Sequence, residues 1–142
     1  MRIATSILFL LFGQYKLANG NFAHSGFPQY LKDFIDTSAL RGYVPFLSIV
    51  QKHAPFFGYT VGIIESSIGI SLLLGLFVRA ASVLGVLFML NMIACTWWGA
   101  GHGMPIWRYF GAELDHIPLL LLFTIFFAAD AGKTWGLDRR RV

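Results

Sequence analysis

Two long apolar stretches constrain this chain more than any other feature of its sequence. Residues 56–77 and 80–98 are almost free of charge and are separated only by Val78 and Arg79. A helix needs about 20 residues to cross the roughly 30 Å hydrocarbon core of a bilayer, and both stretches meet that length. We therefore predict two membrane spans joined by a tight turn at Val78–Arg79.

Two further apolar stretches give weaker signals. Residues 3–18 are short for a span, and residues 111–130 reach the length only by including Glu113, Asp115 and His116. The first stretch could also be a signal peptide. However, the bulky and polar run that ends it offers no small-x-small cleavage site, so a retained helix is favoured.

Composition favours four spans over a water-soluble domain. Only 13% of the residues are charged and 56% are hydrophobic, whereas a soluble domain has about 25% charged and 45–50% apolar residues. This balance excludes disorder and a coiled coil, and the basic residues form no stripe that would suit nucleic acid. The predicted fold is all-α: a single domain, residues 1–142, that forms an integral membrane four-helix bundle in the lipid bilayer.

The connection between the first two spans, residues 19–55, is long and contains three prolines. Apolar residues recur at helical spacing over 28–35 and again over 43–50. We expect one or two short amphipathic helices here, lying at the membrane interface.

Positive charges predict the orientation. Four spans place both termini and the turn near Arg79 on one side. That side carries its charges in shorter segments: Arg2, Arg79, Lys133 and Arg139–Arg141, against Lys32, Arg41, Lys52 and Arg108. The positive-inside rule then places both termini in the cytoplasm and the chain in the cytoplasmic (inner) membrane. An aromatic belt at the opposite interface would contain Trp97, Trp98, Trp107 and Tyr109.

Each predicted span carries a polar side chain that is costly in lipid, and such residues are functional candidates by default. They are Lys16, Glu65, Asn91 and His116. At 1.5 Å of rise per residue, all four fall about 9–13 Å below the outer surface of the hydrocarbon core. We expect a polar cluster in the outer half of the bundle.

Helical facing supports this cluster. Glu65 shares a stripe with Gly58, Gly62 and Gly69, so it should lie on a closely packed face rather than against lipid. Two other stripes are predicted: Lys16 with Thr5, Phe9 and Phe12, and Asn91 with Leu84, Phe88 and Cys95.

Simpler roles stay open for the same residues. Lys16 and Glu65 could form a structural ion pair as readily as a ligand site. Asn91 is favoured as an interhelical hydrogen-bonding residue, and His116 as a solvated turn residue. Cys95, the single cysteine, excludes an intramolecular disulfide and is expected to be a small packing residue.

Three short motifs, taken in order and spacing, resemble the DoxX family. Residues 13–16, Gly-Gln-Tyr-Lys, are similar to the family's Gly-x-x-Lys. Glu65 and the run 72–81, which contains Arg79, resemble its Glu, Leu-Leu-x-Gly-Leu, Arg-x-Ala pattern. The end of the chain, residues 130–138, resembles its closing Gly-x-Gly-x-x-Ser-Leu-Asp and finishes on Asp138, although Asp130 and Gly136 replace a usual Gly and Ser.

The resemblance implies a four-helix membrane protein tied to quinone-linked redox metabolism, with sulfur-compound oxidation as the best-known case. It implies no bound metal or flavin, and a quinone as the substrate. In this hypothesis Lys16 would hydrogen-bond a quinone carbonyl, and Glu65 or His116 would relay protons. Phe9, Phe12 and Trp97 would flank the ring.

Electrons would have to come from a redox partner protein, because the chain has no redox cofactor site of its own. The alternative is a non-catalytic membrane anchor or assembly partner, with the long connection as its docking segment. A homo-oligomer is compatible with either hypothesis. A small-molecule carrier is disfavoured, because four helices without an inverted repeat leave little room for alternating access.

Overall fold

The computed structural model describes the chain except for residues 19, 39, 98–115, 135 and 142. Within this described part, the regular structure is helical throughout, without any strand. The six α-helices are α1 (Arg2–Ala18), α2 (Phe27–Thr37), α3 (Val44–Lys52), α4 (Ala54–Leu74), α5 (Val78–Thr96) and α7 (His116–Ala128). Three single turns complete it: the π-helical η1 (Phe22–Gly26) and the 3-10 turns η2 (Arg41–Tyr43) and η4 (Leu137–Arg141).

The long helices match the predicted spans, but the turn between the second and third lies earlier than predicted. α4 ends at Leu74 because Gly75 adopts the left-handed conformation, with φ 64°, and caps the helix. Phe77 is also left-handed and precedes the first residue of α5. The turn is therefore 75–77, and the prediction of a turn at Val78–Arg79 was wrong: both residues belong to the first turn of α5.

The fourth helix is shorter than predicted. α7 ends at Ala128, and Asp130, inside the predicted span of 111–130, has a left-handed φ of 49° in the turn that follows. Glu113 and Asp115, together with Trp98, Trp107 and Tyr109 of the predicted aromatic belt, lie outside the described residues.

Prolines explain where three helices begin. Pro28, Pro45 and Pro55 each occupy the first turn of α2, α3 and α4, respectively. A first-turn position suits proline because its fixed φ is helical and no N–H is needed there. The expectation of short helices in the connection is confirmed by α2 and α3.

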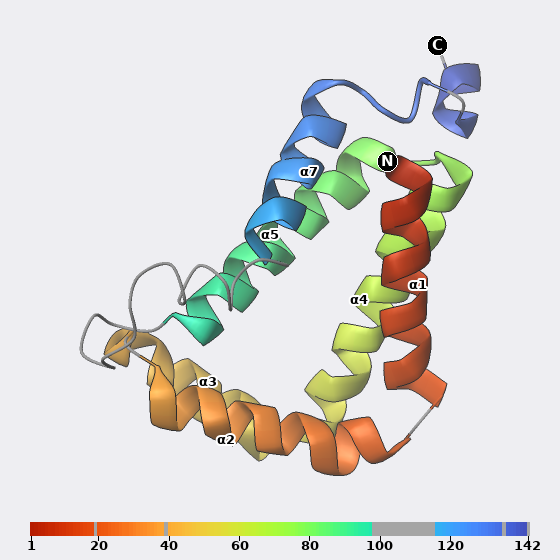
Figure 1. The fold of residues 1–142 in the computed structure, drawn as a ribbon. Coiled ribbons are helices and arrows are strands. Elements are labelled where there is room, and N and C mark those ends of the chain that lie inside the picture. The colour runs from red at the N-terminus through yellow and green to blue at the C-terminus, as the bar shows by residue number, and fades with distance from the viewer. Residues whose placement is uncertain (19, 39, 98–115, 135, 142) are drawn as a thin grey trace.

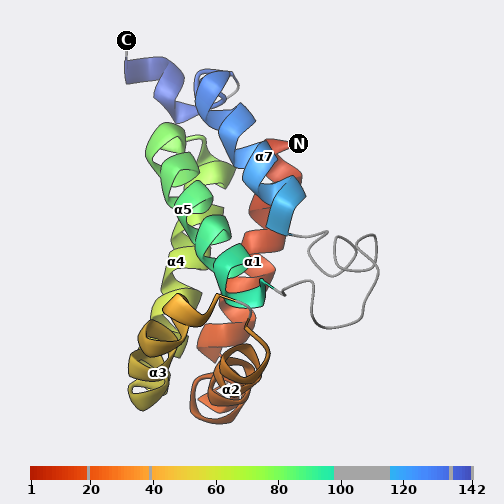
Figure 2. The same cartoon turned by 90° about the vertical axis from the view of Figure 1, so that its left-hand side faces the viewer.

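The long helices are arranged as two pairs. α1 lies along α4, and α5 lies along α7, while the two pairs converge toward the end that holds both termini (Figure 1). The view turned by 90° shows α2 and α3 together at the opposite end (Figure 2). One apolar core joins α1, α4, α5 and α7: Phe9, Ile68, Leu72, Val78, Met89, Phe123 and Phe126.

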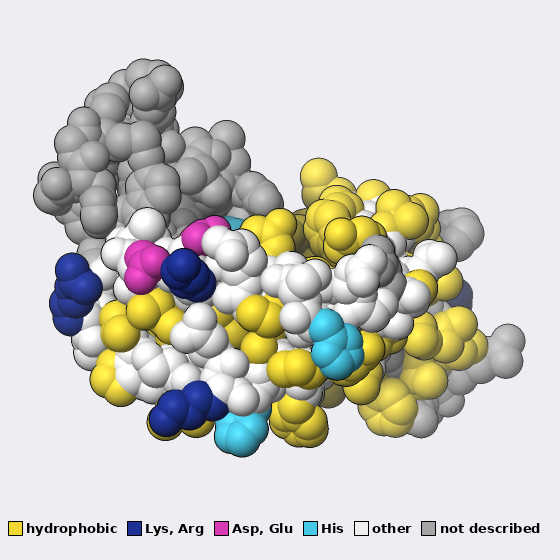
Figure 3. Space-filling view, turned by 90° about the horizontal axis from the view of Figure 1, so that it is seen from below, with side chains coloured by type: hydrophobic (Ala, Val, Ile, Leu, Met, Phe, Trp, Pro, Cys, Tyr) yellow, Lys and Arg dark blue, Asp and Glu magenta, His cyan; other side chains and the backbone are white. Residues whose placement is uncertain are grey.

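A second apolar cluster anchors the connection. It contains Leu31, Leu47, Val50, Ala54 and Cys95, which come from α2, α3, α4 and α5. Cys95 is buried here, which confirms its packing role. The outer side of α2 and α3 carries cationic, acidic and histidine side chains (Figure 3).

α4 and α5 are long and apolar enough to cross a membrane, with mean hydropathies of 1.5 and 1.9. All four long helices also expose large apolar side chains along their outer faces. Examples at more than half exposure are Ile7, Leu11, Ile63, Leu87, Leu121 and Ile125.

Candidate functional site

Glycines bring α1 and α4 into close contact. A Cβ atom on Gly13 would lie 2.7 Å from the backbone nitrogen of Ser66, and one on Gly69 would lie 3.0 Å from the backbone nitrogen of Leu10. Real side chains do not tolerate such contacts with backbone, so only glycine fits. The hydroxyl of Ser6 reinforces the same contact by donating to the carbonyl of Gly69 over 2.8 Å.

The predicted stripe on the second span is confirmed. Gly58, Gly62, Glu65 and Gly69 are all buried on the face of α4 that packs against α1 and η1. Gly62 is placed so that a Cβ atom would lie 3.1 Å from the Cβ of Lys16. The small residues therefore let the Lys16 side chain lie flat against α4, one turn from Glu65.

Lys16 and Glu65 form an ion pair between α1 and α4. The ammonium Nζ of Lys16 donates a hydrogen bond to Oε1 of Glu65. The side chain of Glu65 is only 6% exposed and that of Lys16 is 19% exposed. Among the described residues, the second carboxylate oxygen, Oε2, is buried and accepts no hydrogen bond. The pair is therefore enclosed, but half of the carboxylate's hydrogen-bonding capacity is unused.

An aromatic ring completes the surroundings of the ammonium. Nζ of Lys16 lies 5.4 Å from the centroid of the buried Phe22 ring, within cation–π range. Phe22 opens the π-helical turn η1, whose Ala23 packs on Gly58 of α4. Sequence reasoning missed Phe22, because it lies in the connection and no periodic pattern links it to Lys16.

Asn91 is bonded to the connection rather than to the ion pair. The hydroxyl of Tyr43, in η2, donates a hydrogen bond to Oδ1 of Asn91. Burial, and secondarily the nearby thiol of Cys95, raises the pKa of Tyr43, so the phenol stays protonated and can donate. The expected cluster is therefore divided, although the favoured role for Asn91 as a hydrogen-bonding link between helices fits this contact. Tyr43 was missed for the same reason as Phe22.

The remaining candidates occupy different positions. His116 is the first residue of α7 and is half-buried. Phe9 is 2% exposed and packs edge-to-face on Phe123, with ring centroids 5.2 Å apart. Phe12 is 48% exposed, so the predicted stripe was wrong there: Gly13 is the buried residue of that turn. Trp97 is the exposed C-cap of α5.

Leu84 also departs from its predicted stripe. It is 38% exposed, whereas Gly85 and Met89 are buried on the packed face of α5. The helical period was right in both helices, but the stripe assigned to the core was displaced by about one residue.

Comparison with known protein families now adds to this geometry. The model of the DoxX family matches residues 1–98, more than two thirds of the chain. This chain belongs to the DoxX family. The matched segment contains both members of the ion pair and the Tyr43–Asn91 contact. Searches of curated proteins and of solved structures each found no match.

The closing motif of this DoxX protein acts as a helix cap. The carboxylate of Asp138 accepts hydrogen bonds from the backbone N–H groups of Phe77 and Val78, both 2.9 Å, at the start of α5. Its own N–H donates to the carbonyl of Gly75 over 2.9 Å. The C-terminal segment is thereby fastened to the turn between α4 and α5, which explains why an acidic residue suits this position.

Chemically, the Lys16–Glu65 pair offers one ammonium donor and one carboxylate that could take or give a proton, both among apolar groups. A hydrogen-bond donor in such surroundings can polarise an oxygen of a bound molecule more strongly than it could in water. Among the described residues, no three His, Cys, Asp or Glu side chains come together as a metal site would require.

Proposed function

We propose that this DoxX protein is a quinone-linked subunit of a membrane oxidoreductase, with Lys16 and Glu65 as its quinone-binding groups. The observation that carries the proposal is the enclosed pair with its unused carboxylate oxygen. Ionisable side chains inside a span are expensive, and an ionisable group with spare hydrogen-bonding capacity is more than a helix lock requires.

The proposal places the chain in the cytoplasmic membrane as a single four-helix domain. The exposed apolar faces of α1, α4, α5 and α7 would contact lipid. Both termini lie at one end of the molecule, as four spans require (Figure 1). Arg2, Arg79 and Lys133 belong to that end, which assigns it to the cytoplasm by the positive-inside rule.

The chemistry follows from what quinone reduction needs. A quinone takes up two electrons and two protons to become a quinol, and negative charge develops on its oxygens as the electrons arrive. Lys16 would donate a hydrogen bond to one carbonyl oxygen and stabilise that charge. Glu65, when protonated, would supply a proton and be reprotonated from the outer face, with His116 as a candidate relay. The electrons would come from a redox partner protein.

The test uses the full chain in lipid nanodiscs with decylubiquinone as the probe. Lys16→Met and Glu65→Gln should weaken its binding and lower its reduction in membranes that contain the partner. Lys52→Met, a matched change of an exposed lysine at the end of α3, should have no effect. The double variant Lys16→Met/Glu65→Leu is decisive, because replacing both charges by apolar groups can preserve the fold. Wild-type quinone binding in that folded variant would refute the proposal.

A non-catalytic anchor is the second candidate, and one observation favours it. The end of the molecule formed by α2 and α3 presents a charged, solvent-facing surface suited to another subunit (Figure 3). In that case the ion pair is structural. The double variant would then keep normal activity per assembled complex, while charge reversals on α2, such as Lys32→Glu, would reduce recovery of the partner.

A further inference from the structure

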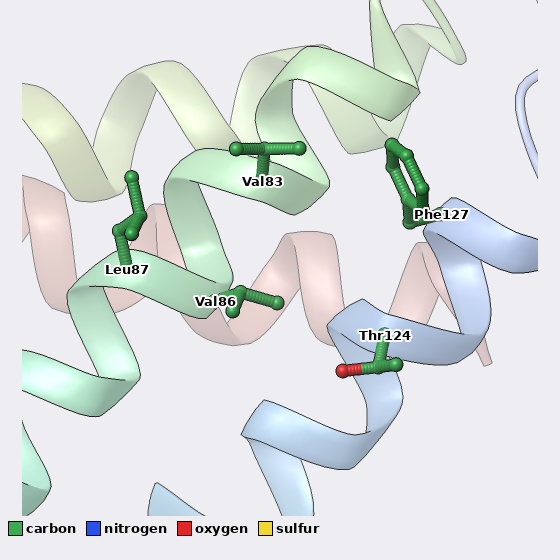
Figure 4. A pocket seen from close by; sticks show the side chains of 5 residues that line it. All are labelled: Val83, Val86, Leu87, Thr124 and Phe127. Carbon is green, nitrogen blue, oxygen red and sulfur yellow. The ribbon is translucent and has the colours of Figure 1, made fainter.

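A shallow apolar groove runs along the junction of α5 and α7. It is lined by Val83, Val86 and Leu87 of α5 and by Thr124 and Phe127 of α7, whose side chains converge on it (Figure 4). The hydroxyl of Thr124 donates to the carbonyl of Leu120 in its own helix, so it presents its methyl group without an unmet hydrogen bond. Nothing polar therefore needs a partner inside the groove.

A cation closes one end of this groove. The guanidinium of Arg79 lies 4.7 Å from the centroid of the Phe127 ring, and Phe127 is itself a lining residue. Arg79 is also one helical turn before Val83, so the two lie on the same face of α5. The ring fixes the guanidinium beside the groove while its hydrogen-bond donors stay accessible, because the side chain of Arg79 is exposed.

The dimensions suit one chain of a lipid. From Arg79 to Leu87 the helix rises about 12 Å, close to the roughly 15 Å depth of one leaflet's hydrocarbon. Arg79 belongs to the end of the molecule that holds both termini, where the headgroups of the cytoplasmic leaflet would lie. An acyl chain in the groove would thus bring its own phosphate to the level of Arg79.

We infer that this groove is a binding site for an anionic phospholipid of the cytoplasmic leaflet, with one acyl chain between α5 and α7 and the phosphate on Arg79. The inference rests on the membrane placement proposed above and not on the quinone chemistry. Charge complementarity selects the occupant, because an exposed, fixed guanidinium at the rim of an apolar groove matches an anionic headgroup above an acyl chain. A second copy of the chain fits less well, since a two-fold contact here would bring two Arg79 side chains together.

The test is native mass spectrometry of the full-length protein in mild detergent, with equimolar phosphatidylglycerol and phosphatidylcholine of identical acyl chains. We expect phosphatidylglycerol to be retained about fivefold more than phosphatidylcholine, the factor that one interfacial cation supplies. Arg79→Gln should reduce this ratio to near one, and Arg79→Lys should keep most of it. Arg41→Gln, which removes an exposed arginine at the opposite end of the molecule, should leave the ratio unchanged.

A second pair of variants tests the groove. Val83→Trp fills it and should lower retention of both lipids, whereas Ile63→Trp, at a comparably exposed position on α4, should not. Equal retention of the two lipids by the wild type, or an unchanged ratio in Arg79→Gln, would overturn the inference. So would a dimer that is lost in Val83→Trp while lipid retention is unchanged.

The outcome is separable from that of the quinone proposal. Arg79→Gln should leave decylubiquinone binding intact, because Arg79 lies at the cytoplasmic end of α5 and outside the α1–α4 pair. Lys16→Met/Glu65→Leu should leave the lipid ratio intact for the corresponding reason. Excess glycerol 3-phosphate should not displace the lipid, because the headgroup alone lacks the acyl chain.

Discussion

The two helix pairs of this protein are held together in different ways. α1 and α4 meet through glycines that touch backbone, a hydrogen bond from Ser6 and a buried ion pair. α5 and α7 meet through apolar side chains, with Gly85 receiving the ring of Phe123. Since lipid is as apolar as leucine, side-chain hydrophobicity alone gives little reason for helices to associate in a membrane. The α1–α4 pair is therefore the more specific contact, and α5–α7 the more adaptable one.

The largest effect should come from breaking the ion pair on one side only. Glu65→Leu leaves the Lys16 ammonium buried without its partner, so we expect a loss of about 3–5 kcal/mol in the free energy of unfolding. Unfolding in detergent, followed by circular dichroism, measures it. Adding Lys16→Met should recover much of the loss, and a double variant as unstable as Glu65→Leu would show that the pair is not the cause.

Alanine at the two contact glycines should separate the helix pairs next. In Gly13→Ala the new Cβ meets the backbone of Ser66, which cannot move alone, and we expect a cost of about 3 kcal/mol. In Gly85→Ala it meets the ring of Phe123, which can rotate or shift, and about 1 kcal/mol is expected. Equal losses in thermal unfolding would contradict the contrast between backbone and side-chain contact.

Removing the cap should affect α5 and spare α1. Asp138→Ala leaves the N–H groups of Phe77 and Val78 without their acceptor, at a cost of about 1–2 kcal/mol. Hydrogen exchange should accelerate in the first turn of α5. Asp33→Ala, on the exposed side of α2, is the control and should change neither quantity. Faster exchange spread evenly over α1 and α5 would argue against a local cap.

The smallest effect sharpens the same comparison. The hydroxyl of Ser6 bonds across to α4, whereas that of Thr124 bonds within its own helix. Ser6→Ala should therefore cost about 0.6 kcal/mol, typical of an interhelical hydrogen bond in a membrane protein, and Thr124→Ala less. Denaturation midpoints of the two variants, measured in one detergent, test the order.

Much of the helical architecture could be predicted because its causes are local. Long apolar runs, first-turn prolines and a helix-capping glycine each act within a few residues. The pairing of Lys16 with Glu65 was also predictable, since a glycine stripe marked the packed face and an unpaired charge in lipid is costly. The stripes containing Phe12 and Leu84 were misassigned, because a helix apolar on every side gives no moment to point at its core.

The sequence by itself thus determined which segments are helical and that two opposite charges must meet. Only the tertiary structure decided that Phe22 covers the ammonium, that Tyr43 reaches Asn91, and that Asp138 caps a helix begun 60 residues earlier. These contacts depend on the path of the connection and of the C-terminal segment through space. No periodicity records that path, because the energy of each contact appears only once distant segments have been brought together.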